Sequence, residues 1–185
     1  MVVGFVGGLG EGKSYSAVLW VARLGRQALK AGSEVTLYSN LDVRLPGVRC
    51  VRFAGPEDFM NMRDGLVLVD EANLVLSSRA WDRVPAQVLM GLASVRKHRL
   101  DMLWTAHSVA RVDRVLREVT TEVYSVRNMI RIGLVRWVRW ELDERGDEFT
   151  RKAGSGWWRF DRAVAGAYDT YADVAASAYL RARRR

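Results

Sequence analysis

The chain has 185 residues, a net charge of +8 and a pI near 10.1. This length fits one globular domain, and a hydrophobic fraction of 49% supplies a sizeable core, which argues against global disorder. One cysteine (Cys50) excludes a disulfide framework, and two histidines argue against a His-rich metal site. Only four of the 29 basic residues are lysine. Arginine binds phosphates and stacks on bases, so a polyanionic partner is indicated, although a coding bias toward arginine explains the composition equally well.

The first half of the chain alternates between strand-like and helix-like segments. Strands are expected at Val2–Val6, Glu34–Ser39, Val48–Phe53, Leu66–Val69 and Asp101–Thr105. Helices are expected at Ser14–Ala31, around Phe59 and Met62, and at Ala86–Lys97. Short apolar runs that alternate with helices predict an α/β fold with a mostly parallel central sheet.

Beyond Asp113 the pattern changes. Ile130–Trp140 is typical of a strand, and Phe149–Phe160 is expected to return as an antiparallel strand that is interrupted at 154–156. The end of the chain, from Ala172, is Ala-rich, basic and helical in pattern. The chain is therefore predicted to be one domain, with a nucleotide-binding core (1–128), a C-terminal β-hairpin (129–160) and a basic helical tail (161–185).

A phosphate-binding loop follows the first predicted strand. Residues 7–14 have the pattern G-x-x-x-x-G-K-S and precede a predicted helix, which is the context expected of a P-loop. Backbone N–H groups of such a loop point at phosphates, Lys13 reaches the β- and γ-phosphates, and Ser14 ligates Mg²⁺. The predicted ATP-binding residues are Gly7, Gly8, Leu9, Gly10, Glu11, Gly12, Lys13, Ser14 and Tyr15.

Two carboxylates follow the buried run at 66–69. Ligands of open α/β sheets bind at the carboxyl ends of the strands, so Asp70 is predicted to hold Mg²⁺ and Glu71 to polarise the attacking water. The next strand ends in Thr105-Ala-His107, whose polar side chains are expected to contact the γ-phosphate or the lytic water. An ordinary strand-end histidine is the alternative for His107.

Five segments carry a family resemblance: GGLGEGKSYSAV (7–18), YSNLDV (38–43), LVLVDEAN (66–73), SVRKHRLDMLWTAHS (94–108) and YDTYADV (168–174). In this order they resemble the Zot-like assembly ATPases of filamentous phages and the FtsK–HerA superfamily packaging ATPases of tailless icosahedral viruses. The resemblance implies a RecA-like P-loop NTPase core that forms a ring, expected to be a hexamer, with an arginine acting in trans on each nucleotide. Candidates are Arg79, Arg83, Arg96 and Arg99, with Arg79 or Arg96 preferred.

Two departures from the family bear on function. His107 stands where the family usually has Gln, which leaves the sensor role open. Filamentous-phage members continue into a transmembrane helix and a periplasmic domain, whereas the longest uncharged stretch here, Val84–Val95, is shorter than the about 20 residues that cross a bilayer. We therefore expect no integral membrane segment and a place in the host cytoplasm during virus assembly, with association with a virion or membrane left open.

Most of the excess positive charge lies in 96–139, which holds ten basic and four acidic residues. Arginines here and four nearby tryptophans (Trp137, Trp140, Trp157, Trp158) fit sequence-independent contact with DNA, or else tryptophans that pack the hairpin on the core.

The leading hypothesis is an ATP-hydrolysing, DNA-translocating motor that packages a viral genome, with a capsid or membrane-vertex protein as a further partner. The alternative is a Zot-like ATPase for phage assembly and extrusion at a membrane. A nucleotide kinase or GTPase switch is disfavoured by the basic charge and the Asp-Glu pair, and a non-catalytic DNA-binding module by the intact phosphate site.

Overall fold

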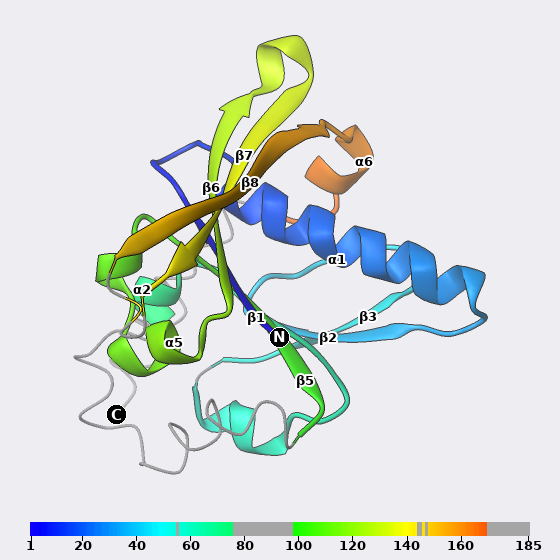
Figure 1. Cartoon of the computed structure of the whole chain (residues 1–185). Helices are drawn as coiled ribbons and strands as arrows, with labels where there is room; N and C mark the ends of the chain where they lie inside the picture. The colour runs from blue at the N-terminus through cyan, green and yellow to red at the C-terminus, as the bar shows by residue number, and fades with distance from the viewer. Residues whose placement is uncertain (55, 76–97, 144–145, 147, 170–185) are drawn as a thin grey trace, which may run out of the picture.

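Eight strands form one sheet in the computed structural model of the chain, which describes residues 1–54, 56–75, 98–143, 146 and 148–169 (Figure 1). The strands are β1 (Val2–Val6), β2 (Val35–Ser39), β3 (Val48–Arg52), β4 (Gly65–Val69), β5 (Leu100–Ala106), β6 (Glu122–Met129), β7 (Leu134–Leu142) and β8 (Phe149–Arg159). The helices and 3₁₀ turns are α1 (Lys13–Lys30), η1 (Pro56–Asn61), α2 (Ala72–Val75), η2 (Val109–Arg111), α5 (Arg114–Val119), η3 (Ile130–Ile132) and α6 (Arg162–Ala165).

The sheet is mostly parallel, as the sequence predicts. Its order is β3-β2-β4-β5-β1-β6-β7-β8, and every pairing from β3 to β6 is parallel. All five residues of β1 are buried, and so are Leu66–Val69 in β4, because helices cover both faces of a parallel sheet. The order places β5 between β1 and β4. Because the three strands are parallel, their carboxyl ends lie side by side.

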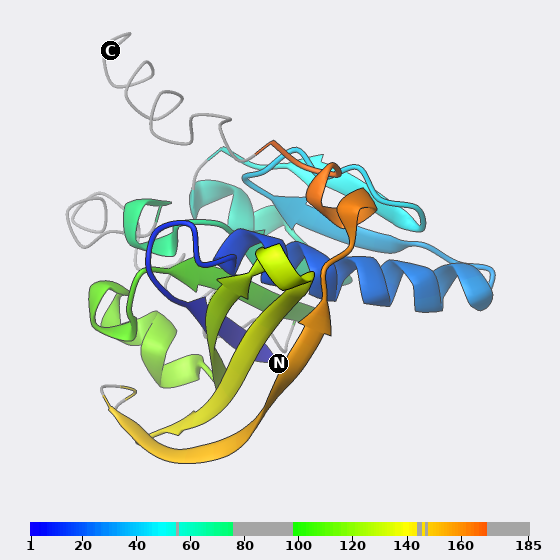
Figure 2. The same ribbon diagram turned by 90° about the horizontal axis from the view of Figure 1, so that it is seen from above.

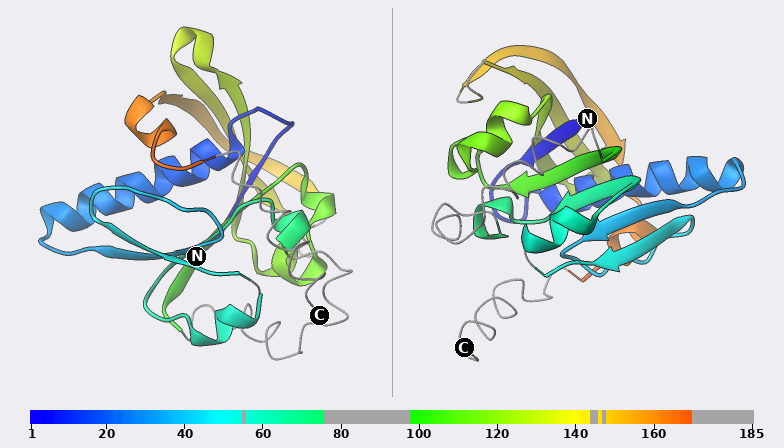
Figure 3. Two further views of the ribbon diagram at one scale, coloured as in Figure 1. Left: turned by 180° about the vertical axis from the view of Figure 1, so that it is seen from behind. Right: turned by 90° about the horizontal axis from the view of Figure 1, so that it is seen from below.

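Two apolar cores lie on opposite faces of the sheet, and both contain strand residues. Helix α1 contributes Val18 and Val21 to the first, where they pack with Phe5 of β1. The second core contains Trp104 of β5 and Leu116 of α5. The right-hand view in Figure 3 shows the strands between α1 on one side and α2 and α5 on the other.

The last two strands, β7 and β8, pair antiparallel with each other, which confirms the predicted hairpin. The prediction is wrong about how the hairpin begins. The sequence pattern does not reveal strand β6, and the segment expected to start a strand at Ile130 is a 3₁₀ turn, after which β7 begins at Leu134. Val123 of β6 lies in one apolar core and Tyr124 and Val126 lie in the other, so both faces of the strand are partly covered and it shows no clean polar alternation.

Strand β8 runs through Gly154 and Gly156, contrary to the predicted interruption there, although its pairing with β7 shifts register between Gly154 and Lys152. A Cβ built at Gly156 would lie 2.7 Å from the Trp137 ring, so the glycine makes room for that ring rather than ending the strand. Figure 2 shows β8 as a long curved strand at the edge of the sheet. The helix expected at Ala86–Lys97 and the basic tail from Ala172 lie outside the described residues.

The four tryptophans of this region have different surroundings. Trp158 is buried and Trp137 half-buried in the α1-side core, which is the packing role that the sequence offered as one alternative. Trp140 donates a hydrogen bond to Ser125 and stacks on Phe149. Trp157 remains 52% exposed. No helix in the described ranges is both long and apolar enough to span a bilayer.

Candidate functional site

The P-loop connects β1 to α1, as predicted. Gly10 and Gly12 have φ angles of 72° and 87°, a region that residues with a Cβ rarely adopt, which explains the glycines at these two positions. Helix α1 begins after Gly12 without any side-chain cap, so the first N–H groups of the helix point into the loop. An uncapped N-terminus of an 18-residue helix is suited to phosphate binding.

Lys13 lies inside this loop rather than at the surface. Its side chain is 5% exposed, and Nζ donates a hydrogen bond to the Gly8 carbonyl at 3.1 Å. Nζ also lies 3.8 Å from Oε1 of Glu71. The ammonium group therefore lies between the Gly8 carbonyl of the P-loop and the Glu71 carboxylate.

Strand β6 supports the P-loop from the side. The Asn128 amide N–H donates to the Glu11 carboxylate at 3.0 Å, and the Asn128 side chain donates to the Gly10 carbonyl at 3.2 Å. A Cβ on Gly7 would lie 2.8 Å from the Val126 carbonyl, which explains this glycine by close approach. The Glu11 carboxylate is thus bonded to β6, and only its backbone remains free to contact a phosphate.

Leu9 and Tyr15, which are also predicted to bind ATP, have different surroundings. Leu9 is 89% exposed at the tip of the loop. The Tyr15 side chain turns away into the α1-side core, where it stacks on Phe160 and accepts a hydrogen bond from the Asp161 N–H at 2.7 Å. Any contact of Tyr15 with a nucleotide would therefore come from its backbone.

Asp70 follows β4 and is 7% exposed. Its Oδ1 accepts a hydrogen bond from the Thr105 hydroxyl at 2.8 Å. Burial raises the pKa of the Asp70 carboxyl, while hydrogen bonds from Ser14 and Thr105 and the charge of Lys13 oppose that rise. A buried carboxylate next to a serine hydroxyl is an oxygen donor set that fits Mg²⁺.

Glu71 contacts three other residues of the site: Lys13, Thr105 and His107. Its backbone has a φ of 49°, and its N–H donates to the Thr105 hydroxyl at 2.9 Å. Oε2 is buried without a hydrogen-bond partner and lies 3.8 Å from Nε2 of His107. A non-glycine residue in this backbone region carries strain. The carboxylate lies between Lys13 and His107, where it can accept a proton from a water.

Asn40 is a site residue that sequence reasoning missed. It is 7% exposed at the end of β2, and its side chain accepts from the Asp70 N–H at 2.8 Å and donates to the Asp70 carbonyl at 2.9 Å. Asn40 lies in YSNLDV (38–43), one of the segments that carry the family resemblance, but a lone Asn after a strand is typical of a turn residue. Its role depends on β2 and β4 being neighbours, which only the fold reveals.

Tyr168 was also missed. It forms an antiparallel bridge with Val43, next to a hydrogen bond from the Arg44 N–H to the Ala167 carbonyl. Burial and the nearby charge of Asp70 raise the pKa of the Tyr168 phenol. The segment after α6 is therefore attached to the loop that carries Asn40.

The predicted trans arginines are only partly described. Arg79, Arg83 and Arg96 lie outside the described residues. Arg99 precedes β5, pairs with Asp64 and lies at the end of β5 opposite His107. This position is far from the P-loop of the same chain.

Comparisons with known proteins identify a matching family and similar folds. The family model described as "Zonular occludens toxin (Zot)" matches residues 47–175. The N-terminal domain of zonular occludens toxin from Neisseria meningitidis superposes with a TM-score of 0.61 at 14% identity, covering 91% of this chain and 98% of that one. The genome packaging NTPase B204 from Sulfolobus turreted icosahedral virus 2 gives 0.52 at 10% identity, over 86% and 97%.

A third similar structure is the flagellar accessory protein FlaH from Methanocaldococcus jannaschii, with a TM-score of 0.53 at 11% identity over 86% of this chain and 85% of that one. No curated protein sequence matches the chain. At these identities the structures establish the P-loop NTPase fold that the sequence predicts.

Proposed function

We propose that this chain, which belongs to the Zot family, is a Mg²⁺-dependent ATPase that couples hydrolysis to movement along DNA. The observation that carries the hydrolytic part is the Glu71 carboxylate, held 3.8 Å from both Lys13 and His107 with one oxygen buried and unpartnered. The B204 packaging NTPase has been solved in complex with the ATP analogue AMPPCP, which supports ATP as the nucleotide.

Each residue of the site has a distinct task in this proposal. The uncapped start of α1 and Lys13 bind the phosphates. Ser14 and Asp70 hold Mg²⁺, which neutralises charge on the phosphate oxygens when bound. Glu71 accepts the proton of the attacking water, and His107 orients that carboxylate. An arginine from a neighbouring copy in a ring completes the site, with Arg79 and Arg96 as the candidates.

DNA is the proposed polymer because the chain is strongly basic and because the similar B204 protein is a genome packaging NTPase. Packaging of a viral genome, which the similarity to B204 supports, is one candidate process, with the protein acting in the host cytoplasm. Phage assembly and extrusion at a membrane is the second, and the family match and the higher TM-score of the zonular occludens toxin domain favour it. The two processes use the same site and differ in the form of DNA.

The test measures phosphate release from ATP with Mg²⁺, without DNA and with double- or single-stranded DNA. We expect hydrolysis that DNA stimulates and that the Lys13→Ala variant loses. Gel filtration with nucleotide bound should show a ring-sized oligomer. An ATPase that ignores both kinds of DNA would refute the translocation proposal, and a chain that binds ATP without hydrolysing it would refute the enzymatic one.

A further inference from the structure

Strands β6, β7 and β8 present different residues on their two faces. Val126, Val135 and Trp158 point toward α1 and belong to the core on that side. Since side chains alternate along a strand, the next residues point the opposite way. Arg127 pairs directly with Arg136, and Arg136 pairs directly with Trp157, so these three side chains form one row across the three strands.

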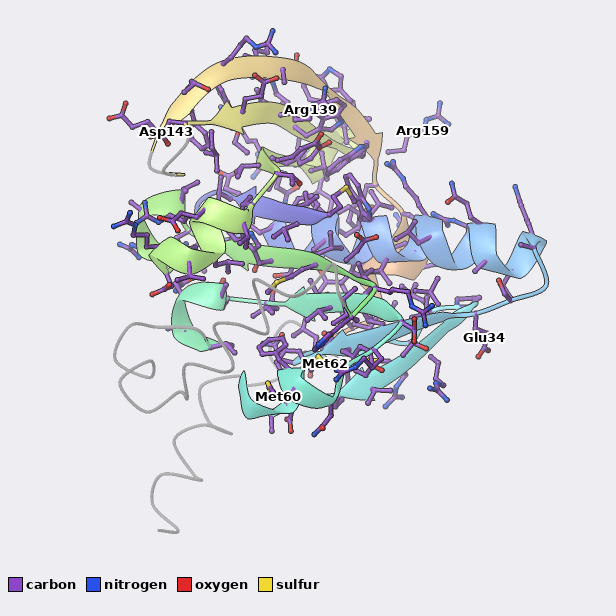
Figure 4. All side chains as sticks on the ribbon, turned by 60° about the horizontal axis from the view of Figure 1, so that its bottom comes forward. Glu34, Met60, Met62, Arg139, Asp143 and Arg159 are labelled. Carbon is purple, nitrogen blue, oxygen red and sulfur yellow. The ribbon has the colours of Figure 1, made fainter. Side chains whose placement is uncertain are left out.

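The row is exposed, and another arginine extends it. Arg127 and Arg136 are exposed, and Trp157 is 52% exposed. Arg159 lies two residues beyond Trp157 on the same face of β8, and Figure 4 shows its side chain extending away from the end of the strand. We call Arg127, Arg136, Trp157 and Arg159 the arginine–tryptophan face.

Two other arginines of β7 and β8, outside this face, form ion pairs with glutamates. Arg139 pairs with Glu122 at 3.1 Å, and Arg151 pairs with Glu141 at 2.6 Å. Within the described part of the chain, no ion pair neutralises the three arginines of the face. Like charges directly opposite each other on neighbouring strands destabilise a sheet. The pairing of Arg127 with Arg136 is therefore explained better by a bound anion than by stability.

The face is also connected to the nucleotide site. Val126 and Asn128, which flank Arg127 on β6, are the residues that approach Gly7 and hydrogen-bond Gly10 and Glu11 of the P-loop. Arg127 therefore lies one residue away from each of two contacts with the P-loop.

We propose that the arginine–tryptophan face binds single-stranded DNA, with the guanidinium groups on phosphates and a base stacked on Trp157. The proposal rests on the proposed function for the identity of the polymer and adds the surface and the form of DNA. A single strand is indicated because its bases are free to stack on an exposed aromatic ring, whereas those of a duplex are already stacked. Adjacent strands lie about 5 Å apart, so the row spans about 10 Å of the surface.

The test measures binding of a fluorescein-labelled oligothymidine of about 20 nucleotides by anisotropy, without ATP, as a function of salt. Trp157→Leu should weaken binding by about tenfold or more, since stacking of one base contributes that much, and Trp157→Phe should restore most of it. Arg136→Gln should weaken binding and lower the slope of log K against log salt by about 0.7, the value for one phosphate contact of a single strand.

Arg49→Gln is the matched control, because Arg49 is exposed on β3 at the opposite edge of the sheet. It should bind as the unmodified chain does. Thermal unfolding and DNA-independent ATP hydrolysis should be unchanged in all variants, which excludes a folding defect.

The possible outcomes distinguish a failure of the arginine–tryptophan face from a failure of the proposed function. Unchanged binding by Arg136→Gln and Trp157→Leu overturns the face alone. Binding of duplex but not of single strands by the unmodified chain overturns the choice of DNA form. An ATPase that binds neither form overturns the face and the proposed coupling together. Single-strand binding that the variants lose, in a chain without ATPase activity, supports the face and contradicts the proposed function.

Discussion

The parallel part of the sheet (β1 to β6) and the antiparallel part (β7 and β8) differ in how much of their strands is exposed to solvent. From β3 to β6 the pairing is parallel, and the central strands are buried on both faces. Polar groups of this part are concentrated at the carboxyl ends, where Asp70, Glu71 and Thr105 meet. In β7 and β8 one face packs on the α1-side core, while Arg136 of β7 and most residues of β8 are exposed to solvent.

The proposed catalytic site lies at the carboxyl ends of the parallel strands, whereas the proposed DNA-binding face lies mostly on the antiparallel strands. A part that is closed on both faces can hold a carboxylate such as Asp70 away from water, whereas an open antiparallel face provides a broad surface for a polymer. Figure 4 shows the length of that surface, with Asp143 and Arg159 near its two ends. Matched substitutions in the two parts test the comparison.

The largest effect is expected from Glu71→Gln, which removes the proposed proton acceptor and keeps the shape of the side chain. We expect kcat for ATP hydrolysis to fall by about 10²–10⁴-fold, the usual contribution of a general base. Nucleotide binding should persist, since Lys13 and the P-loop are intact. Glu34→Gln, an exposed carboxylate far from the site, is the control. Retained hydrolysis in Glu71→Gln would assign the base to another group.

Asn40→Ala should affect both activity and stability. It leaves the backbone N–H and carbonyl of Asp70 without their partners, and each unsatisfied buried group costs about 1–3 kcal/mol. We expect the free energy of unfolding, from urea titration, to fall by about 2–4 kcal/mol, and kcat to fall more than KM changes. A variant with full stability and full activity would show that Asp70 needs no such support.

Two glycines compare packing in the two parts directly. A Cβ on Gly4 of β1 would lie 2.2 Å from the buried Trp104 ring, and a Cβ on Gly156 of β8 would lie 2.7 Å from the Trp137 ring. Trp104 is fully buried and cannot move, whereas Trp137 is partly exposed. Gly4→Ala should therefore lower the free energy of unfolding by about 1–3 kcal/mol or more, and Gly156→Ala by less. Equal losses in urea titrations would mean that the extension is packed as tightly as the parallel part.

The smallest effect is expected from Arg151→Gln in β8. Arg151 is exposed and donates a hydrogen bond to the partly exposed Glu141 carboxylate, which lowers the pKa of that carboxyl. Solvent screens such pairs, so we expect no resolvable change in Tm at moderate salt. A clear drop in Tm would show that the outer strands depend on this ion pair, and would weaken the contrast between the two parts of the sheet.

The sequence alone determined the P-loop motif, the acidic pair and the alternation of strands and helices, because each depends on residues that are neighbours in the chain. Glycines at 7–12 and Lys13 act within one strand–loop–helix unit, and short apolar runs mark strands buried on both faces. The hairpin is predictable for a similar reason, since β7 and β8 are close together in the sequence.

Only the tertiary structure decided the roles that depend on strand order. Asn40 acts on Asp70 because β2 lies beside β4, and Thr105 bonds to Asp70 because β5 lies beside β4. Arg127, Arg136 and Trp157 form one row because of a register that spacing along the chain does not reveal. Strand pairing joins residues that are far apart in sequence, so local pattern cannot specify which side chains meet across a sheet.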